Sequence, residues 1–387
     1  MTHPMYPSKL SEVFQSLAEH GFDGMAAAME VLLNECMRIE RQQALGAGPY
    51  QRSDDRRGQA NGFKPKHVKT RIGELELAVP QVRGMKFYPA ALERGVRSEK
   101  ALKLALAEMY VQGVATRKMA QITEQLCGCE VSSSEVSRAA AALDDELEKW
   151  RERPLGEIKY LILDARYEKV RDAGRVRDVA VFTAIGVNSE GRRSVLGVSV
   201  SLSEAEVHWR DFFQSLLKRG LHGVELITSD AHAGLAQARQ ACFSGVPWQR
   251  CQFHLLRNAL AHVPKQEMQR EVMDDLRGVL DATDEASGQE QLRRVVRKYE
   301  KAAPKLAAWM EANVPEGMTV LRLPPAHRKR LRTTNMLERL NRELKRRTRV
   351  ATLFPNDAAL LRLVSAILIE LSEEWETGKR YVTFDSK

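Results

Sequence analysis

Two aspartates stand where a buried β-strand would end. Asp164 follows the apolar run Tyr160–Leu163, and Asp230 follows the short run Leu226–Ser229. A carboxylate at the tip of a buried strand costs free energy unless it is hydrogen-bonded or binds a cation. Carboxylate oxygens suit Mg²⁺ or Mn²⁺, which keep part of their water shell and accept phosphate oxygens. The alternative, that each aspartate only caps a turn, stays open for either residue alone.

A third carboxylate, Glu338, lies in a stretch with the pattern of an amphipathic helix. Leu337, Leu340 and Leu344 recur at the spacing of one buried helix face. Glu338 falls one residue off that face, so we expect its side chain at the margin of the buried surface. It could form an ion pair with Arg342 one turn along the helix, or it could be a third metal ligand.

The same helix carries most of the excess positive charge. The 387 residues include 60 Lys and Arg against 51 Asp and Glu, a formal net charge of +9. Ten basic residues and only two Glu fall within residues 326–350. Such a cationic stripe predicts a polyanionic partner, most often nucleic acid, because a face of ion pairs would need more acidic residues. The candidates for DNA contacts are Arg332, Arg339, Asn341, Arg342, Lys345, Arg346, Arg347 and Arg349.

The segments that must position these residues have the layout of an α/β fold. Three β-rich runs lie within residues 158–203, and a helical pattern over 204–220 separates them from the short strand before Asp230. This order predicts a mixed sheet in which two strand-end carboxylates face one crevice. Residues 253–322 are almost wholly helical by pattern and predict an inserted helical subdomain. A long C-terminal helix is expected from Asp357 to about Thr377.

The N-terminal part of the chain predicts elements that could bind DNA. Residues 1–45 have a helical pattern, and the alternating apolar residues 75, 77 and 79 after the break at Gly73 predict a β-hairpin with basic side chains. Residues 116–143 have the outline of a helix-turn-helix, with Thr116 and Ser132–Ser134 as candidate caps. An ordinary helical hairpin gives the same pattern, so both interpretations remain open.

Together these blocks resemble the bacterial Mutator-type insertion-sequence transposases, a family of the DDE superfamily with an RNase H-like catalytic core. The matching sequences are LDARYEKVR, the block from AIGVNSEGRR to FFQSLLKRGL, ITSDAHAGL, WQRCQFHLLRNAL and LRTTNMLERLNRELKRRTRVATLFPN. The resemblance covers roughly residues 50–382 in the family's order and spacing. It implies that Asp164, Asp230 and Glu338 form the catalytic acidic triad and bind two Mg²⁺ or Mn²⁺ ions.

The resemblance also includes Cys251 and His254, in the sequence CQFH. It implies that His254 approaches the active site and contacts DNA or the scissile phosphate. A zinc site would need about four ligands, and no second pair at a suitable spacing accompanies these two residues. A buried structural role for Cys251 remains an alternative.

The implied fold is an α/β, RNase H-like mixed-sheet catalytic core with an inserted all-helical subdomain, preceded by a mainly helical N-terminal DNA-binding region with a β-hairpin. Five segments are expected. They are residues 1–97 with the N-terminal helices and basic hairpin, 98–152 with the helix-turn-helix-like region, 153–252 with the first part of the core, 253–325 with the helical insertion, and 326–387 with the rest of the core.

The implied function is DNA transposition by metal-dependent cleavage and strand transfer. The partners would be the terminal inverted repeats of the protein's own element and target DNA, bound by at least a homodimer. One alternative is a catalytically silent DNA-binding regulator derived from a transposase, which the presence of all three acids disfavours. Another is an RNase H-like nuclease that cuts without joining, which the length of the resemblance disfavours.

Composition argues against several other classes of protein. Hydrophobic residues make up 43% and charged residues 29% of the chain, as in soluble globular proteins. No apolar run approaches the ~18 residues of a membrane span, and the first residues lack the basic-then-apolar layout of a signal peptide. Five scattered cysteines fit a reducing compartment. We therefore expect a cytoplasmic, nucleoid-associated bacterial protein that binds no membrane.

Overall fold

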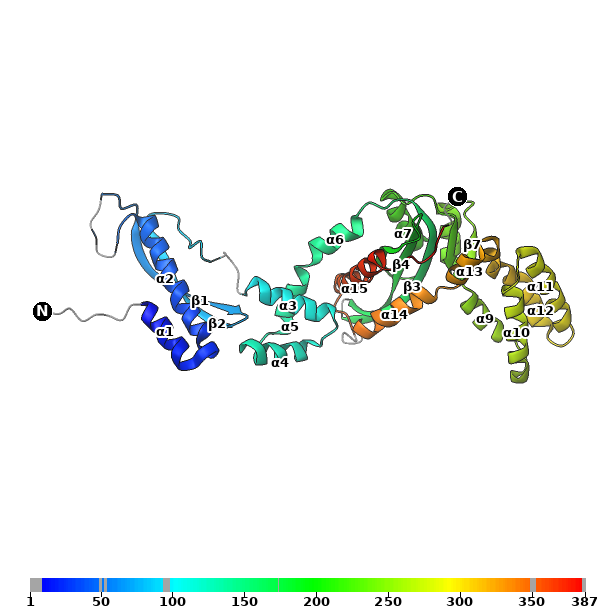
Figure 1. The fold of residues 1–387 in the computed structure, drawn as a ribbon, viewed down its shortest axis with the longest axis horizontal. Helices are drawn as coiled ribbons and strands as arrows, with labels where there is room; N and C mark the ends of the chain where they lie inside the picture. The colour runs from blue at the N-terminus through cyan, green and yellow to red at the C-terminus, as the bar shows by residue number, and fades with distance from the viewer. Residues whose placement is uncertain are drawn as a thin grey trace. The chain divides into compact units, whose positions relative to one another are not determined.

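The chain forms two compact units, Met1–Ala142 and Leu143–Lys387 (Figure 1). The computed structural model describes residues 9–48, 51, 54–92, 98–172, 174–348 and 353–384. Each unit has buried apolar clusters of its own, so each is described separately.

The first unit combines helices with one hairpin. Its elements are α1 (Lys9–His20), η1 (Gly21–Gly24), α2 (Met25–Leu45), β1 (Gln59–Thr70), β2 (Gly73–Arg83), α3 (Lys100–Val111), α4 (Thr116–Cys127) and α5 (Ser133–Ala141).

The hairpin forms where the sequence predicts it. Strands β1 and β2 pair antiparallel, with Thr70 opposite Gly73 at the turn. Gly73 has φ +132°, a conformation that residues with a Cβ rarely adopt. The three predicted apolar positions of β2 are buried together with Met37 of α2. This burial gives the strand the half-covered face that its alternating pattern requires.

Two helices also occupy the predicted helix-turn-helix segment. Helix α5 begins with a capping box, because the Ser132 hydroxyl accepts a bond from the backbone N–H of Glu135, whose carboxylate accepts one from the Ser132 N–H. The prediction of a cap from Ser132–Ser134 is confirmed. The prediction for Thr116 is wrong, since Thr116 is already helical and Ala115 at the cap position makes no side-chain bond. DNA binding by this segment stays a prediction.

The second unit holds the sheet and most of the helices. Its first elements are α6 (Asp144–Glu152), β3 (Ile158–Asp172), β4 (Arg175–Asn188), β5 (Arg193–Ser201), α7 (Glu206–Lys218), β6 (Leu226–Ser229), α8 (Ala233–Cys242) and β7 (Trp248–Arg250). They are followed by α9 (Gln252–Leu260), η2 (Gln266–Met268), α10 (Gln269–Leu280), α11 (Glu285–Tyr299), α12 (Pro304–Asn313), η3 (Val314–Gly317), η4 (Thr319–Arg322), α13 (Pro325–Leu331), α14 (Asn335–Thr348) and α15 (Asp357–Thr377).

The sheet of this unit is mixed and five-stranded, in the order β5-β4-β3-β6-β7. Strands β3, β4 and β5 pair antiparallel as consecutive hairpins, whereas β6 pairs parallel with both β3 and β7. The predicted α/β class and the predicted order of strands and helices are confirmed.

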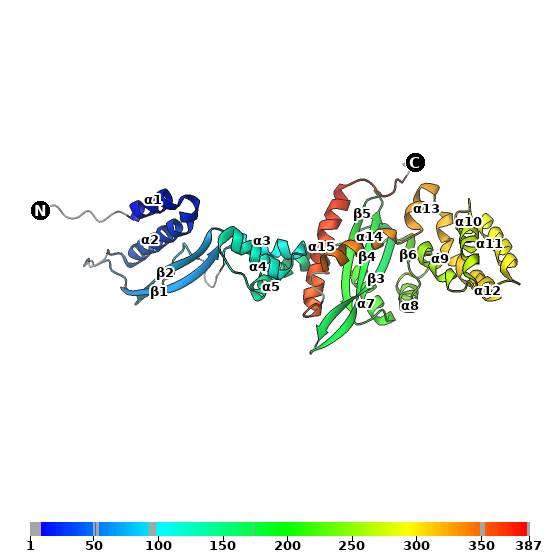
Figure 2. The ribbon, with the colours of Figure 1, turned by 90° about the horizontal axis from the view of Figure 1, so that it is seen from below.

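Helices cover the sheet on both faces. On one face, α7 and α8 bury Trp209, Phe213 and Leu235 against Leu161 of β3 and Phe182 of β4. The Trp209 and Phe182 rings stack with their centroids 4.0 Å apart. Across the other face lies α14, and α15 runs along β5 (Figure 2). The amphipathic pattern predicted for α14 is confirmed, because its three stripe leucines are all buried.

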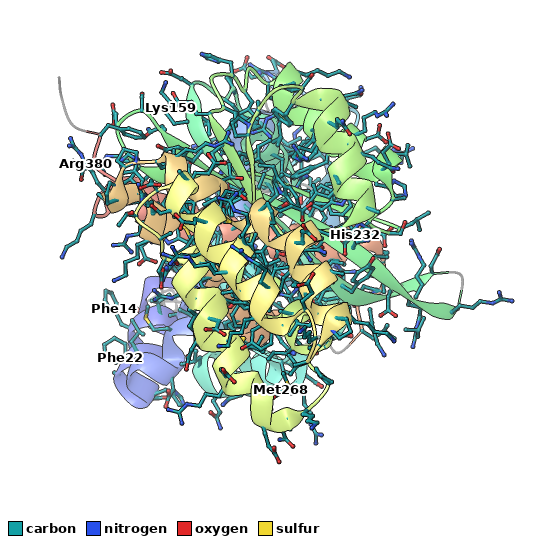
Figure 3. The ribbon with its side chains drawn as sticks, turned by 90° about the vertical axis from the view of Figure 1, so that its right-hand side faces the viewer. Phe14, Phe22, Lys159, His232, Met268 and Arg380 are labelled. Atoms are coloured by element: carbon teal, nitrogen blue, oxygen red, sulfur yellow. The ribbon has the colours of Figure 1, made fainter. Side chains whose placement is uncertain are left out.

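Helices α9–α12 build a separate apolar cluster outside the sheet (Figure 3, where Met268 marks their margin). The chain returns from this cluster beside the point where it left. The Thr228 hydroxyl donates to the Leu331 carbonyl, and the Gln252 N–H donates to the Arg332 carbonyl, each over 2.9 Å. These bonds fix the start of the segment that leads to α14 against the edge of the sheet.

None of the helices in the described ranges has both the length and the apolar character needed to cross a bilayer.

Trp209→Ala should lower the free energy of unfolding by about 3–5 kcal/mol, because it empties the largest side-chain site between α7 and the sheet. Val207→Ala on the same helix removes an exposed side chain and should change it by less than about 0.5 kcal/mol. Urea unfolding of both variants measures the difference. Equal losses would mean that α7 is not anchored by Trp209.

Candidate active site

The parallel register of β3 and β6 brings Asp164 and Asp230 together. Ile162 pairs with Thr228, and extending that register by two residues sets the two aspartates opposite each other on one face of the sheet. Asp230 follows the last residue of β6, as predicted. Asp164 does not end its strand, because β3 continues to Asp172 by pairing with β4, with a further bridge between Val170 and Phe354.

Asp164 is held by helix α14. The Asn341 side-chain amide donates to Asp164 Oδ2 over 2.5 Å, and Arg166 Nη1 donates to the Asn341 carbonyl over 3.1 Å. Burial raises the pKa of Asp164 to about 6, although the bond from Asn341 and the nearby His254 oppose the rise. The carboxylate therefore lies in a site where a bound cation would favour its ionised form.

His254, in the first turn of α9, lies between the other two carboxylates. Its Nδ1 is 3.8 Å from Asp230 Oδ2, and its Nε2 is 3.8 Å from Glu338 Oε1. The Cys251 sulfur raises the pKa of His254 to about 9, with Asp230 and Asp164 adding to the rise and burial opposing it. At neutral pH a cationic imidazolium thus sits among three acids.

The Glu338 carboxylate neither forms the ion pair considered for it along the helix nor is fully exposed to solvent. No ion pair links it to Arg342, both residues being described. Its Oε1 is buried and has no hydrogen-bond partner in the described part of the chain. A buried carboxylate oxygen without a donor is costly, so this atom is available to a ligand that the chain does not itself supply.

Cys251, at the start of α9, is hydrogen-bonded to a residue of β6 and to the residue before α14. Its Sγ is fully buried and accepts bonds from the backbone N–H and the hydroxyl of Thr334, both over 3.3 Å, just before α14. Its own N–H donates to the Ser229 carbonyl over 2.8 Å. Burial would raise the pKa of Cys251, but hydrogen bonds from His254 and Thr334 outweigh it and lower the pKa. The cysteine so connects β6, α9 and the start of α14.

The donors in this crevice fit a hard cation in type. They are carboxylate oxygens, and one of them, Glu338 Oε1, has no hydrogen-bond partner among the described residues. His254 lies between the carboxylates of Asp230 and Glu338. Across the described ranges, however, no three His, Cys, Asp or Glu side chains are arranged closely enough to hold a metal ion as they stand. A metal would require these side chains to draw closer, and for zinc the pair Cys251 and His254 gains no further ligand.

Two more titratable groups reach this crevice that sequence reasoning missed. Glu204, in the loop between β5 and α7, lies 3.9 Å from His232 Nδ1. Burial raises the pKa of Glu204, and the nearby Asp230 adds to the rise. Figure 3 labels His232 at the start of α8. His232 follows Asp230 by two residues in the sequence, whereas Glu204 has no sequence spacing that points to the site, because its loop approaches Asp230 only in the folded chain.

The seven predicted DNA-contact residues that the structure describes divide into three groups. Arg339, Arg342 and Lys345 are exposed and make no ion pair with a described residue. Arg332 pairs with Asp281, Arg346 pairs with Glu343, and Asn341 holds Asp164. Arg347 is buried and bonds to both Glu343 and Glu370, so its guanidinium is used within the fold. Arg349 lies outside the described residues.

The ion pairs of Glu343 should make stability depend on pH. Arg346 and then Arg347 lower the pKa of Glu343 from 4.5 to about 2, against the opposing effect of burial. A carboxyl whose pKa is depressed in the fold stabilises it above the unfolded-state pKa, and this contribution is lost as the pH falls. The stability difference between the wild type and Glu343→Gln should therefore be constant from pH 7 to about 5 and shrink towards pH 2.

Urea unfolding at several pH values would check this expectation. Glu373→Gln, an exposed carboxyl on α15, is the control and should show no such trend. A difference between wild type and Glu343→Gln that stays constant down to pH 2 would contradict the assignment.

Known proteins resemble this chain along nearly its whole length. Residues 4–378 match the family described as "Transposase, Mutator family". The transposase for insertion sequence element IS406 from Burkholderia multivorans is 54% identical over 97% of this chain and 97% of its own. That for ISRM5 from Rhizobium meliloti is 43% identical over 94% and 91%. That for IS256 in transposon Tn4001 from Staphylococcus aureus is 36% identical over 97% of both chains.

Proposed function

Because the chain belongs to the Mutator family of transposases, we propose that it binds the ends of an insertion sequence and catalyses cleavage and strand transfer of DNA. The observation that carries the proposal is the convergence of Asp164, Asp230 and Glu338 around His254, from two strands and a helix far apart in the sequence. We propose further that the mixed sheet is an RNase H-like core and that these acids are the catalytic triad.

In this proposal the three carboxylates hold two Mg²⁺ or Mn²⁺ ions. Bound there, the ions would lower the pKa of the attacking water or 3′-hydroxyl and stabilise the departing oxygen. The side chains have separate tasks. Asn341 fixes the orientation of Asp164 by its hydrogen bond. His254, protonated at neutral pH, offers a positive charge and N–H donors to the scissile phosphate.

DNA would be held by cations that the fold leaves exposed. Arg342 lies one helical turn after Glu338, and Lys345 lies one turn after Asn341, so phosphates bound to them would lie beside the carboxylates. Such contacts position the backbone without reading sequence. Recognition of the terminal inverted repeats is assigned to the hairpin β1–β2 and to α4–α5 in the first unit. Since two ends must be joined, we propose at least a homodimer on DNA.

Two other functions are weighed against this one. A silent DNA-binding regulator would not need three acids to meet around a histidine, nor a buried Glu338 oxygen left without a donor. An RNase H-like nuclease would share the site but would release cut strands without joining them. A strand-transfer assay separates all three.

Asp164→Asn and Glu338→Gln should each reduce cleaved and joined products on the order of 10²-fold or more, while binding of the element end persists. The assay uses a labelled element end with Mg²⁺ or Mn²⁺. Glu373→Gln, an exposed carboxyl on α15, is the matched control and should keep full activity. Cutting without joining would favour the nuclease, and binding without either reaction in the wild type would favour the regulator.

Neutralising Arg342 and Lys345 together should weaken binding to all DNA sequences alike. The dependence of log K on log salt should become shallower by about 0.9 for each phosphate that the variant no longer binds. Fluorescence anisotropy with an element end and with an unrelated duplex measures both effects. Reduced affinity for the element end alone would assign these residues to sequence recognition and contradict phosphate binding.

A further inference from the structure

A second cationic site lies beside α14, separate from the crevice of the three acids. It is a pocket of about 380 Å³ between the start of β5, the end of α13, the first half of α14, the end of α15 and the segment after α15. Its charged and aromatic lining consists of Arg193, Lys329, Arg330, Arg339, Trp375 and Tyr381, with Glu374 as its one acid. Among these residues only Arg339 is a predicted DNA contact.

The positive charge of this pocket is largely uncompensated. None of its four cations forms an ion pair with a described residue, and Glu374 is exposed. Burial lowers the pKa of Arg193, and repulsion from Arg339 and Arg330 lowers it further against the opposing effect of Tyr381. Four cations that meet in one concave site without counter-charges raise its affinity for an anion.

Two aromatic rings hold the innermost cation in place. The Arg193 guanidinium lies 4.3 Å from the centroid of the Trp375 ring and 5.2 Å from that of Tyr381. The Tyr381 hydroxyl donates to the Arg330 carbonyl over 2.7 Å, and its ring lies 5.4 Å from the Arg330 guanidinium. Because stacking uses the faces of the guanidinium, its N–H groups at the edge stay free to donate.

The form of the site indicates the class of ligand. The Trp375 face that borders Arg193 is covered by this guanidinium, and the Tyr381 ring contacts both Arg193 and Arg330, so these faces do not offer a platform on which a nucleobase could stack. What remains is a set of N–H donors in a fork geometry that suits phosphate oxygens. Glu338 and Arg339 are adjacent on α14, so a phosphate bound here lies one residue along the chain from the proposed catalytic acid.

We propose that this pocket binds a backbone phosphate of the DNA strand next to the scissile bond. The inference rests on the proposed action on DNA and adds a second contact, on the side of α14 away from Asn341. Trp375 is a positioning residue in this assignment, since it touches Arg193 and not the phosphate.

The test measures binding of a labelled duplex element end by anisotropy in EDTA, so that no cleavage intervenes. Lys329→Gln with Arg330→Gln should weaken binding about fivefold to tenfold at 0.1 M salt and make the dependence of log K on log salt shallower by about 0.9, as expected for one phosphate contact. Arg293→Gln with Lys305→Gln removes two exposed charges from α11 and α12 and is the matched control. Thermal unfolding confirms that each variant is folded.

A second comparison isolates the stacking. Trp375→Ala should weaken binding by about the same factor as the charge variant, whereas Trp375→Phe should keep most of the affinity, because a ring still holds Arg193. Affinity and salt dependence equal to the control in both the charge and the Trp375→Ala variants would overturn the proposal.

Inorganic phosphate serves as a competitor to separate a site for free phosphate from a site for DNA. If phosphate binds the wild type and loses affinity in the charge variant, while DNA binding stays unchanged, the pocket takes free phosphate and the proposal is wrong. If the wild type binds no DNA at all, the proposed function fails first. Retained strand transfer with unchanged DNA binding in the variants would overturn only the pocket.

Discussion

The attachment of α14 across β3 is the constraint on which the rest of the site depends. The side-chain amide of Asn341 donates a hydrogen bond to Asp164, and the backbone carbonyl of Asn341 accepts one from Arg166. One residue therefore fixes the position of both the helix and the carboxylate. The buried leucine stripe supplies the apolar contact that makes these polar bonds possible without water. Without this attachment Glu338 would have no defined position relative to the sheet.

Bringing three carboxylates together costs electrostatic free energy, and the positive charge of His254 offsets part of this cost. Burial and mutual repulsion both disfavour ionised carboxylates, as the raised pKa of Asp164 indicates. His254 supplies a positive charge between Asp230 and Glu338, and its pKa is raised first by the hydrogen bond with Cys251 and then by Asp230 and Asp164. The single imidazolium offsets part of the negative charge of the three acids. A ligand of higher charge would offset more of it if the side chains drew closer.

Helix α14 separates three tasks by its faces. The leucines meet the sheet, Glu338 and Asn341 meet the carboxylate crevice, and Arg339 meets the cationic pocket. The insertion of α9–α12 between β7 and α14 is compatible with this arrangement. Hydrogen bonds from Thr228 to Leu331 and from Gln252 to Arg332 hold the chain beside the sheet where the insertion ends. Cys251 adds a third connection through Thr334.

The sequence by itself determined the elements of this protein. Local periodicity fixes where apolar side chains can be buried, so the hairpin, the amphipathic α14 and the long α15 could all be predicted, as could the α/β order of the second unit. A helix cap within Ser132–Ser134 could also be predicted, because a cap is a contact between residues close in the sequence. The proposal that Asp164, Asp230 and Glu338 act as one triad came from the resemblance to a family, not from spacing alone.

Only the tertiary structure decided which side chains meet. Pairing with β4 carries β3 past Asp164, which no apolar run could indicate. The burial of Arg347 against Glu370, the approach of Glu204 to Asp230, and the stacking of Arg193 on Trp375 each join residues from distant segments. A run of basic residues looks uniform in a sequence. Folding divides it into cations that hold the structure and cations left free, because an ion pair depends on distance in space and not along the chain.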